Sequence, residues 1–302
     1  MFPIIPANSA TAASGNDNGI FGYGYGGGYR SLTNIVSNVG VVASDVAGVG
    51  TARYGIAATG YGTDKGIFGF GIVSGYMGMT NLVSNAGVVA SDVAAVGTAR
   101  QGCGGSVYGS DKAIFAFGYH AGATFVSMSN LVSNTGVVAT DTAGVGTARN
   151  GLKGTEYSAN KDKGIMGYGN TGSITAITNL VSNTGVVATD TAGVGTARSG
   201  LAACRYSTDK SIFGYGHDGN NASMTNLVSN TGVVATDTAG VGTARSSLAA
   251  TEYGGDKGIF GYGHISPTDQ TITNLVSNTG VVGTDVAGVG TARRSLAACS
   301  FN

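Results

Sequence analysis

The amino-acid sequence predicts an all-β fold built from one repeated unit. A segment of about 48 residues recurs six times along the 302 residues of the chain. No window shows the 3.6-residue apolar period of a helix. Gly accounts for 54 residues, roughly 18% against a usual ~7%, and it stands among Ile, Val, Phe and Tyr, which favours short strands joined by tight turns. A repeat of this length is typical of four-stranded blades, so we expect a six-bladed β-propeller.

Each unit carries three nearly constant landmarks, which recur every 47 to 51 residues. The Ile that opens Ile-Phe-Gly-Tyr-Gly or a close variant is Ile20, Ile67, Ile114, Ile165, Ile212 and Ile259. The Asn that opens Asn-Leu-Val-Ser-Asn or a close variant is Asn34, Asn81, Asn130, Asn179, Asn226 and Asn274. A Thr-Ala-Arg triplet ends on Arg53, Arg100, Arg149, Arg198, Arg245 and Arg293. This regularity indicates one structural unit per repeat.

The last complete unit illustrates the strands that we expect in each blade. Residues 247–251 form the innermost strand a, and residues 257–263 form strand b. A variable b–c loop, 264–270, leads to strand c at 271–277. An Asn-Thr-Gly turn of the kind that joins hairpins leads to strand d at 281–286.

Strand b explains why the units are expected to stack. Side chains alternate along a strand, so Ile259 is predicted on one face and Phe260 with Tyr262 on the other. Gly261 and Gly263 then lie on the Ile face and leave room for aromatic rings from the neighbouring blade. Because both faces are apolar, each blade needs a neighbour on both sides.

The order of strands along the chain predicts how the propeller closes. The chain begins near strand b and ends on residues 295–300, which form an innermost strand. This last strand is expected to complete the first blade, which closes the ring and removes its edges. Residues 17–302 are thus the propeller. Residues 1–16 are an N-terminal arm, in which residues 9–14 weakly resemble strand a.

The repeat resembles Kelch-type propeller repeats. In that family an Arg precedes strand a and a Gly pair ends strand b; here these correspond to Arg245 and to Phe260-Gly261-Tyr262-Gly263. Two features depart from the family: the Gly-Gly doublet has become Gly-Tyr-Gly, and the chain contains no Trp. The near-identical units also resemble repeat-rich propellers of environmental bacteriophages, which implies a virion surface or tail component.

Composition excludes several classes of function. The formal net charge is zero and 11% of residues are charged, so a nucleic-acid partner is not expected, whereas self-association is favoured. No apolar run approaches the ~18–20 residues of a membrane span, so membrane insertion is not expected, and no signal peptide is recognised. The resemblance to bacteriophage propellers implies a virion or extracellular location. Cys103, Cys204 and Cys299 are expected to be free thiols, because the last two replace a Thr of other units.

The b–c loops differ between units that are otherwise nearly constant. They emerge on the same face as the d–a loops, and variable loops on a constant scaffold are typical recognition sites. A second interpretation stays open, in which these loops vary because nothing constrains them. The candidate binding residues are Tyr25, Tyr29, Arg30, Tyr76, Tyr119, His120, His217, Asp218, Asn220, His264 and Asp269.

The chemistry of these residues favours binding over catalysis. His120, His217 and His264 belong to blades three, five and six, so exposed loop histidines are expected and no metal or cofactor. Stacking of Tyr29, Tyr76 or Tyr119 on a sugar ring is more plausible than a metal site. The six repeat Arg either grip an anion near the channel or brace their blades through an Asp or a carbonyl; we favour bracing.

The sequence therefore predicts a non-enzymatic structural or binding protein. The first hypothesis is a phage virion component, a tail, fibre or surface part, which packs against other virion or surface proteins or against itself. The alternative is a lectin-like propeller that binds a cell-surface glycan through the b–c loops. No Ser/His/Asp or Cys/His arrangement recurs along the chain.

Overall fold

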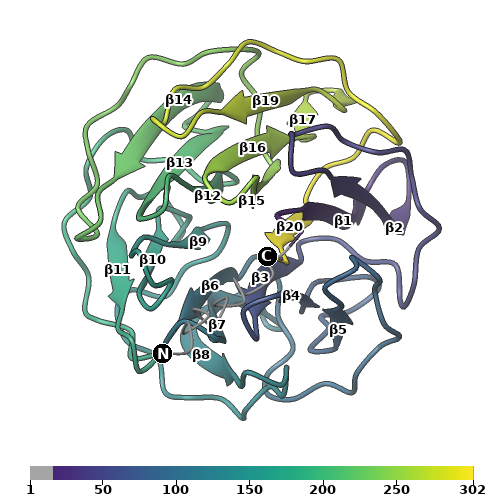
Figure 1. Cartoon of the computed structure of the whole chain (residues 1–302). Coiled ribbons are helices and arrows are strands. Elements are labelled where there is room, and N and C mark those ends of the chain that lie inside the picture. The colour runs from purple at the N-terminus through teal and green to yellow at the C-terminus, as the bar shows by residue number, and fades with distance from the viewer. Residues whose placement is uncertain (1–15, 302) are drawn as a thin grey trace, which may run out of the picture.

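The computed structural model describes residues 16–301, and this part of the chain is all β, as the sequence predicts. Its strands form six three-stranded antiparallel sheets and one two-stranded hairpin. Figure 1 shows the sheets arranged around a common centre, toward which one strand of each sheet lies. Apart from Asn16, the expected N-terminal arm lies outside the described residues.

The sheets, each given from its innermost strand outward, follow one another along the chain. They are β20 (Ala297–Ser300), β1 (Gly19–Tyr25) and β2 (Tyr29–Val36); β3 (Ala57–Tyr61), β4 (Lys65–Gly69) and β5 (Thr80–Val83); β6 (Gly104–Tyr108), β7 (Lys112–His120) and β8 (Thr124–Val132); β9 (Lys153–Glu156), β10 (Gly164–Gly167) and β11 (Thr178–Val181); β12 (Ala202–Tyr206), β13 (Lys210–His217) and β14 (Asn221–Val228); and β15 (Ala249–Tyr253), β16 (Lys257–Gly261) and β19 (Thr273–Val276). The hairpin is β17 (His264–Ile265) with β18 (Thr268–Asp269). The last strand of the chain joins the first sheet, since β20 pairs with β1 from Gly19 opposite Ser300 to Gly22 opposite Ala297.

The predicted fourth strand is wrong: each sheet has three strands rather than four. Residues 281–286 run beside β19 but make only two isolated bridges, from Val286 to Thr273 and from Val282 to Val276. Between these bridges the side-chain amide of Asn274 donates to the Gly283 carbonyl at 3.0 Å. A side chain thus occupies the place of a backbone partner, the register slips by one residue, and no regular ladder forms.

The predicted faces of strand b are also wrong at the tyrosine. Tyr262 has a left-handed backbone, with φ +63°, and this breaks the alternation of side chains. Ile259 and Tyr262 therefore share one face and pack with Phe21 of the next sheet, while Phe260 packs on the opposite side. A period-two pattern does not anticipate a non-Gly residue in this conformation.

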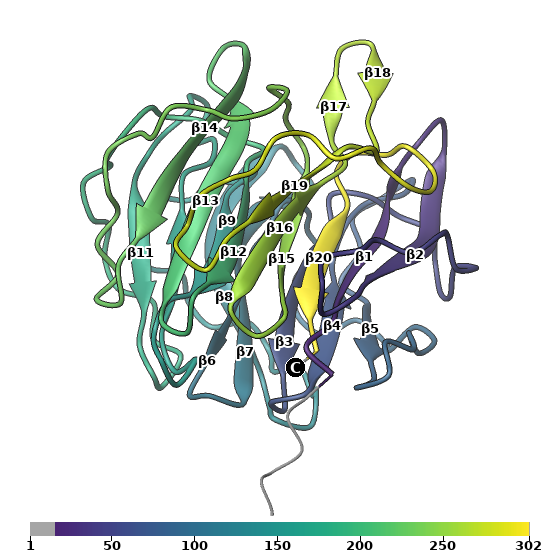
Figure 2. The same ribbon diagram turned by 45° about the horizontal axis from the view of Figure 1, so that its top comes forward.

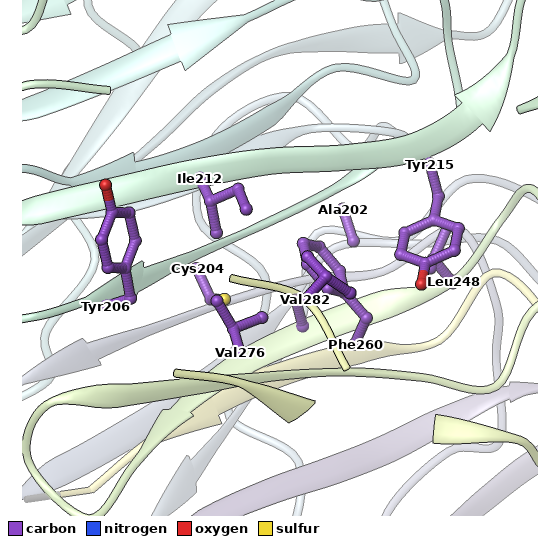
Figure 3. Packing of buried hydrophobic residues seen from close by; sticks show 10 residues of the cluster. Ala202, Cys204, Tyr206, Ile212, Tyr215, Leu248, Phe260, Val276 and Val282 are labelled. Atoms are coloured by element: carbon purple, nitrogen blue, oxygen red, sulfur yellow. The ribbon is translucent and has the colours of Figure 1, made fainter. Parts of the chain in front are cut away.

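Hydrophobic clusters fill the spaces between neighbouring sheets. Figure 3 shows the cluster between the sheets of β13 and β16, where Tyr215 meets Phe260 with ring centroids 5.1 Å apart. Gly214 makes room for this ring, because a Cβ there would lie 2.6 Å from the Phe260 ring. The predicted role of Gly263 is wrong: its missing Cβ would face the Ser246 carbonyl of its own unit, at 2.8 Å.

One pair of neighbouring units fills the same space differently. The third unit has Ala116 where the others have Gly, and the fourth has Met166 where the others have Phe. These two residues belong to one cluster, and both are fully buried. Met166 therefore supplies a flexible thioether in place of the phenyl ring of the other units, opposite the Cβ of Ala116 that their glycines lack.

The six repeat Arg are the largest fully buried side chains, at 0% exposure: Arg53, Arg100, Arg149, Arg198, Arg245 and Arg293. Arg149 donates from Nε to the Tyr168 carbonyl at 2.8 Å, from Nη1 to the Thr147 carbonyl at 3.0 Å, and from Nη2 to Asn179 Oδ1 at 2.6 Å. Its guanidinium lies over the Phe117 ring, 4.1 Å from the centroid. The side chain thus bonds two units together and is shielded from solvent.

An Asp completes this network in each unit. Asp190 accepts hydrogen bonds from the amide and hydroxyl of Thr147 and from the Asn179 amide. Partial burial acts to raise the pKa of Asp190, but these hydrogen bonds outweigh it and hold the pKa below its usual value. Burial lowers the pKa of Arg149 to about 10, with Asp190 acting in the opposite direction. We call this Arg, Asn, Asp and Thr set the brace.

Backbone hydrogen bonds connect the starts of the innermost strands in a circuit. The second residue after each repeat Arg donates its amide to the carbonyl of the same position in the preceding unit, at 2.7–3.0 Å. The donors are Gly55, Gly102, Gly151, Gly200, Ser247 and Ser295, and the amide of Gly55 donates to the carbonyl of Ser295. All six have positive φ, between +50° and +64°. Cys103, Cys204 and Cys299 are buried free thiols, as expected.

Candidate binding face

The b–c loops lie beside the residues that follow the repeat Arg. Backbone bridges join these two parts in every unit, as between Tyr54 and Ile72, or between Ser246 and His264. We call the surface formed by both the loop face. Figure 2 shows the β17–β18 hairpin projecting from this side of the molecule.

Three tyrosines form a compact group on the loop face. Tyr25 ends β1, Tyr29 begins β2, and Tyr54 follows a repeat Arg. Tyr29 and Tyr54 are stacked, with centroids 5.8 Å apart and planes at 5°, and Tyr25 meets both rings edge-on at 5.9 Å. Tyr29 is 43% exposed, so one side of the group faces solvent.

Two further candidates extend this group along the face. Tyr76 and Tyr119 lie with centroids 6.2 Å apart, and Tyr119 meets Phe125 edge-on at 5.1 Å. Burial, followed by the nearby hydroxyls of Tyr119 and Tyr54, raises the pKa of Tyr76. We call Tyr25, Tyr29, Tyr54, Tyr76 and Tyr119 the tyrosine sector; it spans three consecutive sheets.

The sector ends at a charged group. His264 Nδ1 lies 2.8 Å from Asp269 Oδ1 across the β17–β18 hairpin, and Arg294 Nη1 lies 3.1 Å from the same oxygen. The Arg294 guanidinium lies 5.1 Å from the centroid of Tyr25. Arg30 donates to the Gly26 carbonyl at 2.7 Å and so braces its own turn.

The other candidates are not brought together. His217, Asp218 and Asn220 form a self-contained turn, in which the Asp218 carboxylate accepts the Asn220 amide at 3.0 Å. His120 ends β7 opposite Thr124. Within residues 16–301, no group of three His, Cys, Asp or Glu side chains is placed to hold a metal ion.

Within the part of the chain that the structure describes, the opposite arc of the loop face carries no comparable aromatic group. Where the first two units have Tyr54 and Gln101 after the repeat Arg, the next three have Asn150, Ser199 and Ser246. Their bridge partners in the b–c loops are polar as well, as Asn170 is for Asn150. The loop face is therefore asymmetric, although the scaffold beneath it is repeated.

A cavity of about 160 Å³ opens at the centre of the loop face. Its wall includes Tyr54, the amide side chains of Gln101 and Asn150, and leucines such as Leu152. Lys153 also lines it and is its charged residue. Burial lowers the pKa of Lys153 to about 8, while Cys103 acts in the opposite direction.

A second charged group lies at the far end of the innermost strands. Glu252 is buried, with Lys161 Nζ 3.2 Å from Oε2 and Arg205 Nη1 4.0 Å from Oε1. Burial raises the pKa of Glu252, although both cations act to lower it. Glu156 also lines this end, so two acidic and two basic groups compensate each other.

Sequence reasoning missed Tyr54, Arg294 and Lys153, which lie outside the b–c loops. An alignment of the six units contains the signal for Lys153, because the other units have Ala or Gly at that position. Tyr54 and Arg294 occupy the position directly after the repeat Arg, in the d–a loop. The six units carry Tyr, Gln, Asn, Ser, Ser and Arg at this position.

No model of a known protein family matches the chain, and a search of curated proteins finds no similar sequence. Nothing in residues 16–301 forms a helix of the length and apolarity that crossing a bilayer requires.

Proposed function

We propose that the chain is a closed six-bladed β-propeller that acts as a non-enzymatic binding platform. The pairing of β20 with β1 and the circuit of backbone hydrogen bonds around six units support this architecture. Closure covers both apolar faces of every sheet. It leaves the loop face as one surface where the units differ.

The ligand that fits this face best is a carbohydrate. The observation that carries this proposal is the tyrosine sector, in which rings from three consecutive sheets gather in one arc while the opposite arc is polar. A tyrosine offers an apolar ring face and a hydroxyl, which suit the C–H faces and the hydroxyl groups of a sugar. Few rotatable bonds keep the cost of ordering such side chains low.

Glycan-array screening followed by titration of the bound glycans tests this function. Tyr29→Ala and Tyr76→Ala are expected to weaken binding at least tenfold, because each removes a stacking surface. Asn220→Ala, in a turn of the opposite arc, is the matched control and should leave affinity unchanged. Silence on the array, or unchanged affinity in both tyrosine variants, would contradict carbohydrate binding.

A repeated exposed valine favours a second candidate, a structural component of a phage virion. One Val per unit is 62–66% exposed: Val41, Val88, Val137, Val186, Val233 and Val281. With zero net charge, little electrostatic repulsion opposes packing against other virion proteins or against another copy. The resemblance to bacteriophage propellers suggests the same virion or extracellular setting, without nucleic acid or membrane insertion.

Sedimentation analysis tests this second candidate. The protein is expected to self-associate at tens of micromolar, and charged substitutions such as Val137→Lys with Val186→Lys should reduce this association. This candidate would be contradicted if the protein stays monomeric at all concentrations and the neighbouring genes encode no structural virion proteins.

A further inference from the structure

We propose that the ligand of the loop face is an acidic glycan, whose carboxylate binds Lys153 in the central cavity. This inference rests on the proposed carbohydrate function and adds the chemical class of the sugar. Lys153 lies outside the b–c loops, and its ammonium group supplies a positive charge that the tyrosine sector lacks.

Lys153 is an exception within the repeat. It begins β9, an innermost strand, and its equivalents in the other units are Ala57, Gly104, Ala202, Ala249 and Ala297. A lysine costs side-chain entropy and desolvation at a site where the scaffold otherwise carries a small apolar residue. Packing therefore gives no reason for its presence.

The charge of Lys153 has no acidic partner among the described residues. No ion pair or hydrogen bond involves its ammonium group, whereas Arg294 has Asp269, and Lys161 and Arg205 have Glu252. The cavity around Lys153 is lined by amides, hydroxyls, leucines and one tyrosine. A bound carboxylate would supply the acidic partner that the wall of this cavity lacks.

The shape of the cavity places such a ligand against the tyrosines. Tyr54 lines the cavity and also stacks on Tyr29, so the cavity and the tyrosine sector share a wall. Lys153 also lines a second, smaller cavity of about 30 Å³, whose other residues include Ala58 and Ala203. A ligand that enters from the loop face thus reaches Lys153 with its charged end while its ring remains beside Tyr54.

The experiment is a glycan array in which each sialic-acid or uronic-acid glycan is paired with its neutral parent, followed by titration of the strongest binders. Acidic glycans are expected to bind about tenfold more tightly than their neutral parents, and Lys153→Ala should abolish this difference. Lys153→Ala is expected to fold, because four other units carry Ala at this position. Lys112→Ala, at the start of β7 in a partly exposed ion pair, is the matched lysine control and should retain the preference.

The outcomes separate this inference from the proposed function. If glycans bind but neutral and acidic members of each pair bind equally, or if Lys153→Ala keeps the preference, the acidic-glycan inference is overturned and carbohydrate binding stands. If no glycan binds at all, both are overturned. Thermal unfolding of Lys153→Ala near the wild-type midpoint verifies that any loss of binding is local.

Discussion

The brace is constant in sequence from unit to unit, whereas the loop face of the same units varies. The brace uses the same Arg, Asn, Asp and Thr in all six units, with nearly the same hydrogen-bond lengths. The loop face changes from a group of tyrosines to a polar turn within half a circuit. The difference indicates that the repeated residues hold the units together, while the departures on the loop face are available for the recognition proposed above.

The geometry explains this division. The brace connects residues of neighbouring units, such as Thr147 and Asp190, so one substitution affects the contact between two sheets. The turn of the fifth unit, in contrast, bonds polar groups locally, as Asp218 does with the backbone amide of Asn220. Because its hydrogen bonds lie within the loop, such a loop can change sequence without disturbing neighbouring units.

The largest effect is expected from Arg149→Ala, which leaves Asn179 and the carbonyls of Tyr168 and Thr147 without their donor. We expect a loss of about 3 kcal/mol in the free energy of unfolding, measured by urea denaturation. Asn220→Ala on the loop face should change it by less than about 0.5 kcal/mol. Equal losses in the two variants would remove the distinction between brace and loop face. If Arg149→Ala does not fold, Arg149→Lys provides a milder test, because Lys lacks the planar fork.

A smaller effect is expected where two units depart from the repeat inside the core. Met166→Phe restores the ring of the other units against the Cβ of Ala116 and should cost about 2 kcal/mol through overpacking. Adding Ala116→Gly should recover most of this loss. A double-mutant cycle measures the coupling, and additive effects would show that the two residues do not share one space.

Acid should weaken the brace more than the loop face. The brace carboxylates have pKa values below their usual range in the folded protein. Their contribution to the free energy of unfolding is therefore full above the unfolded-state pKa of about 3.9, and it is lost as the pH falls toward the folded-state pKa values. Each contributes less than about 1 kcal/mol, because its side chain is about 30% exposed. Unfolding free energies measured from pH 6 to pH 3 should fall, and less steeply in Asp190→Asn. A flat profile would contradict this role.

The smallest effect concerns the circuit of backbone hydrogen bonds. Ser247 has φ +56°, a conformation that favours Gly, so Ser247→Gly should raise the free energy of unfolding by roughly 0.5 kcal/mol after the entropy cost of Gly. Gly151→Ser should lower it by a similar amount, since a Cβ there would meet no atom closer than 3.6 Å and only the backbone conformation opposes it. Thermal denaturation distinguishes the two signs. Changes of the same sign would show that local packing outweighs the backbone conformation.

Much of the fold follows from patterns within one unit. The Ile-Phe-Gly pattern places strand b, and the Gly of that pattern marks the close approach of a neighbouring ring, as Gly214 does for Phe260. The tyrosine candidates in the b–c loops were found because those loops vary. Tyr54 was missed, since its partner Tyr29 lies in a different part of the repeat.

The sequence alone determined the repeat, the all-β class, the order of the three regular strands and the free thiols, because each depends on residue type and spacing within one unit. The tertiary structure decided which face Tyr262 occupies, that Asn274 interrupts the fourth strand, and that Lys153 lines a cavity with Tyr54. These three features depend on contacts across the fold. They are the left-handed backbone of Tyr262, the Asn274 side chain that replaces a backbone partner, and the cavity wall that Lys153 shares with Tyr54. No periodic pattern records such contacts.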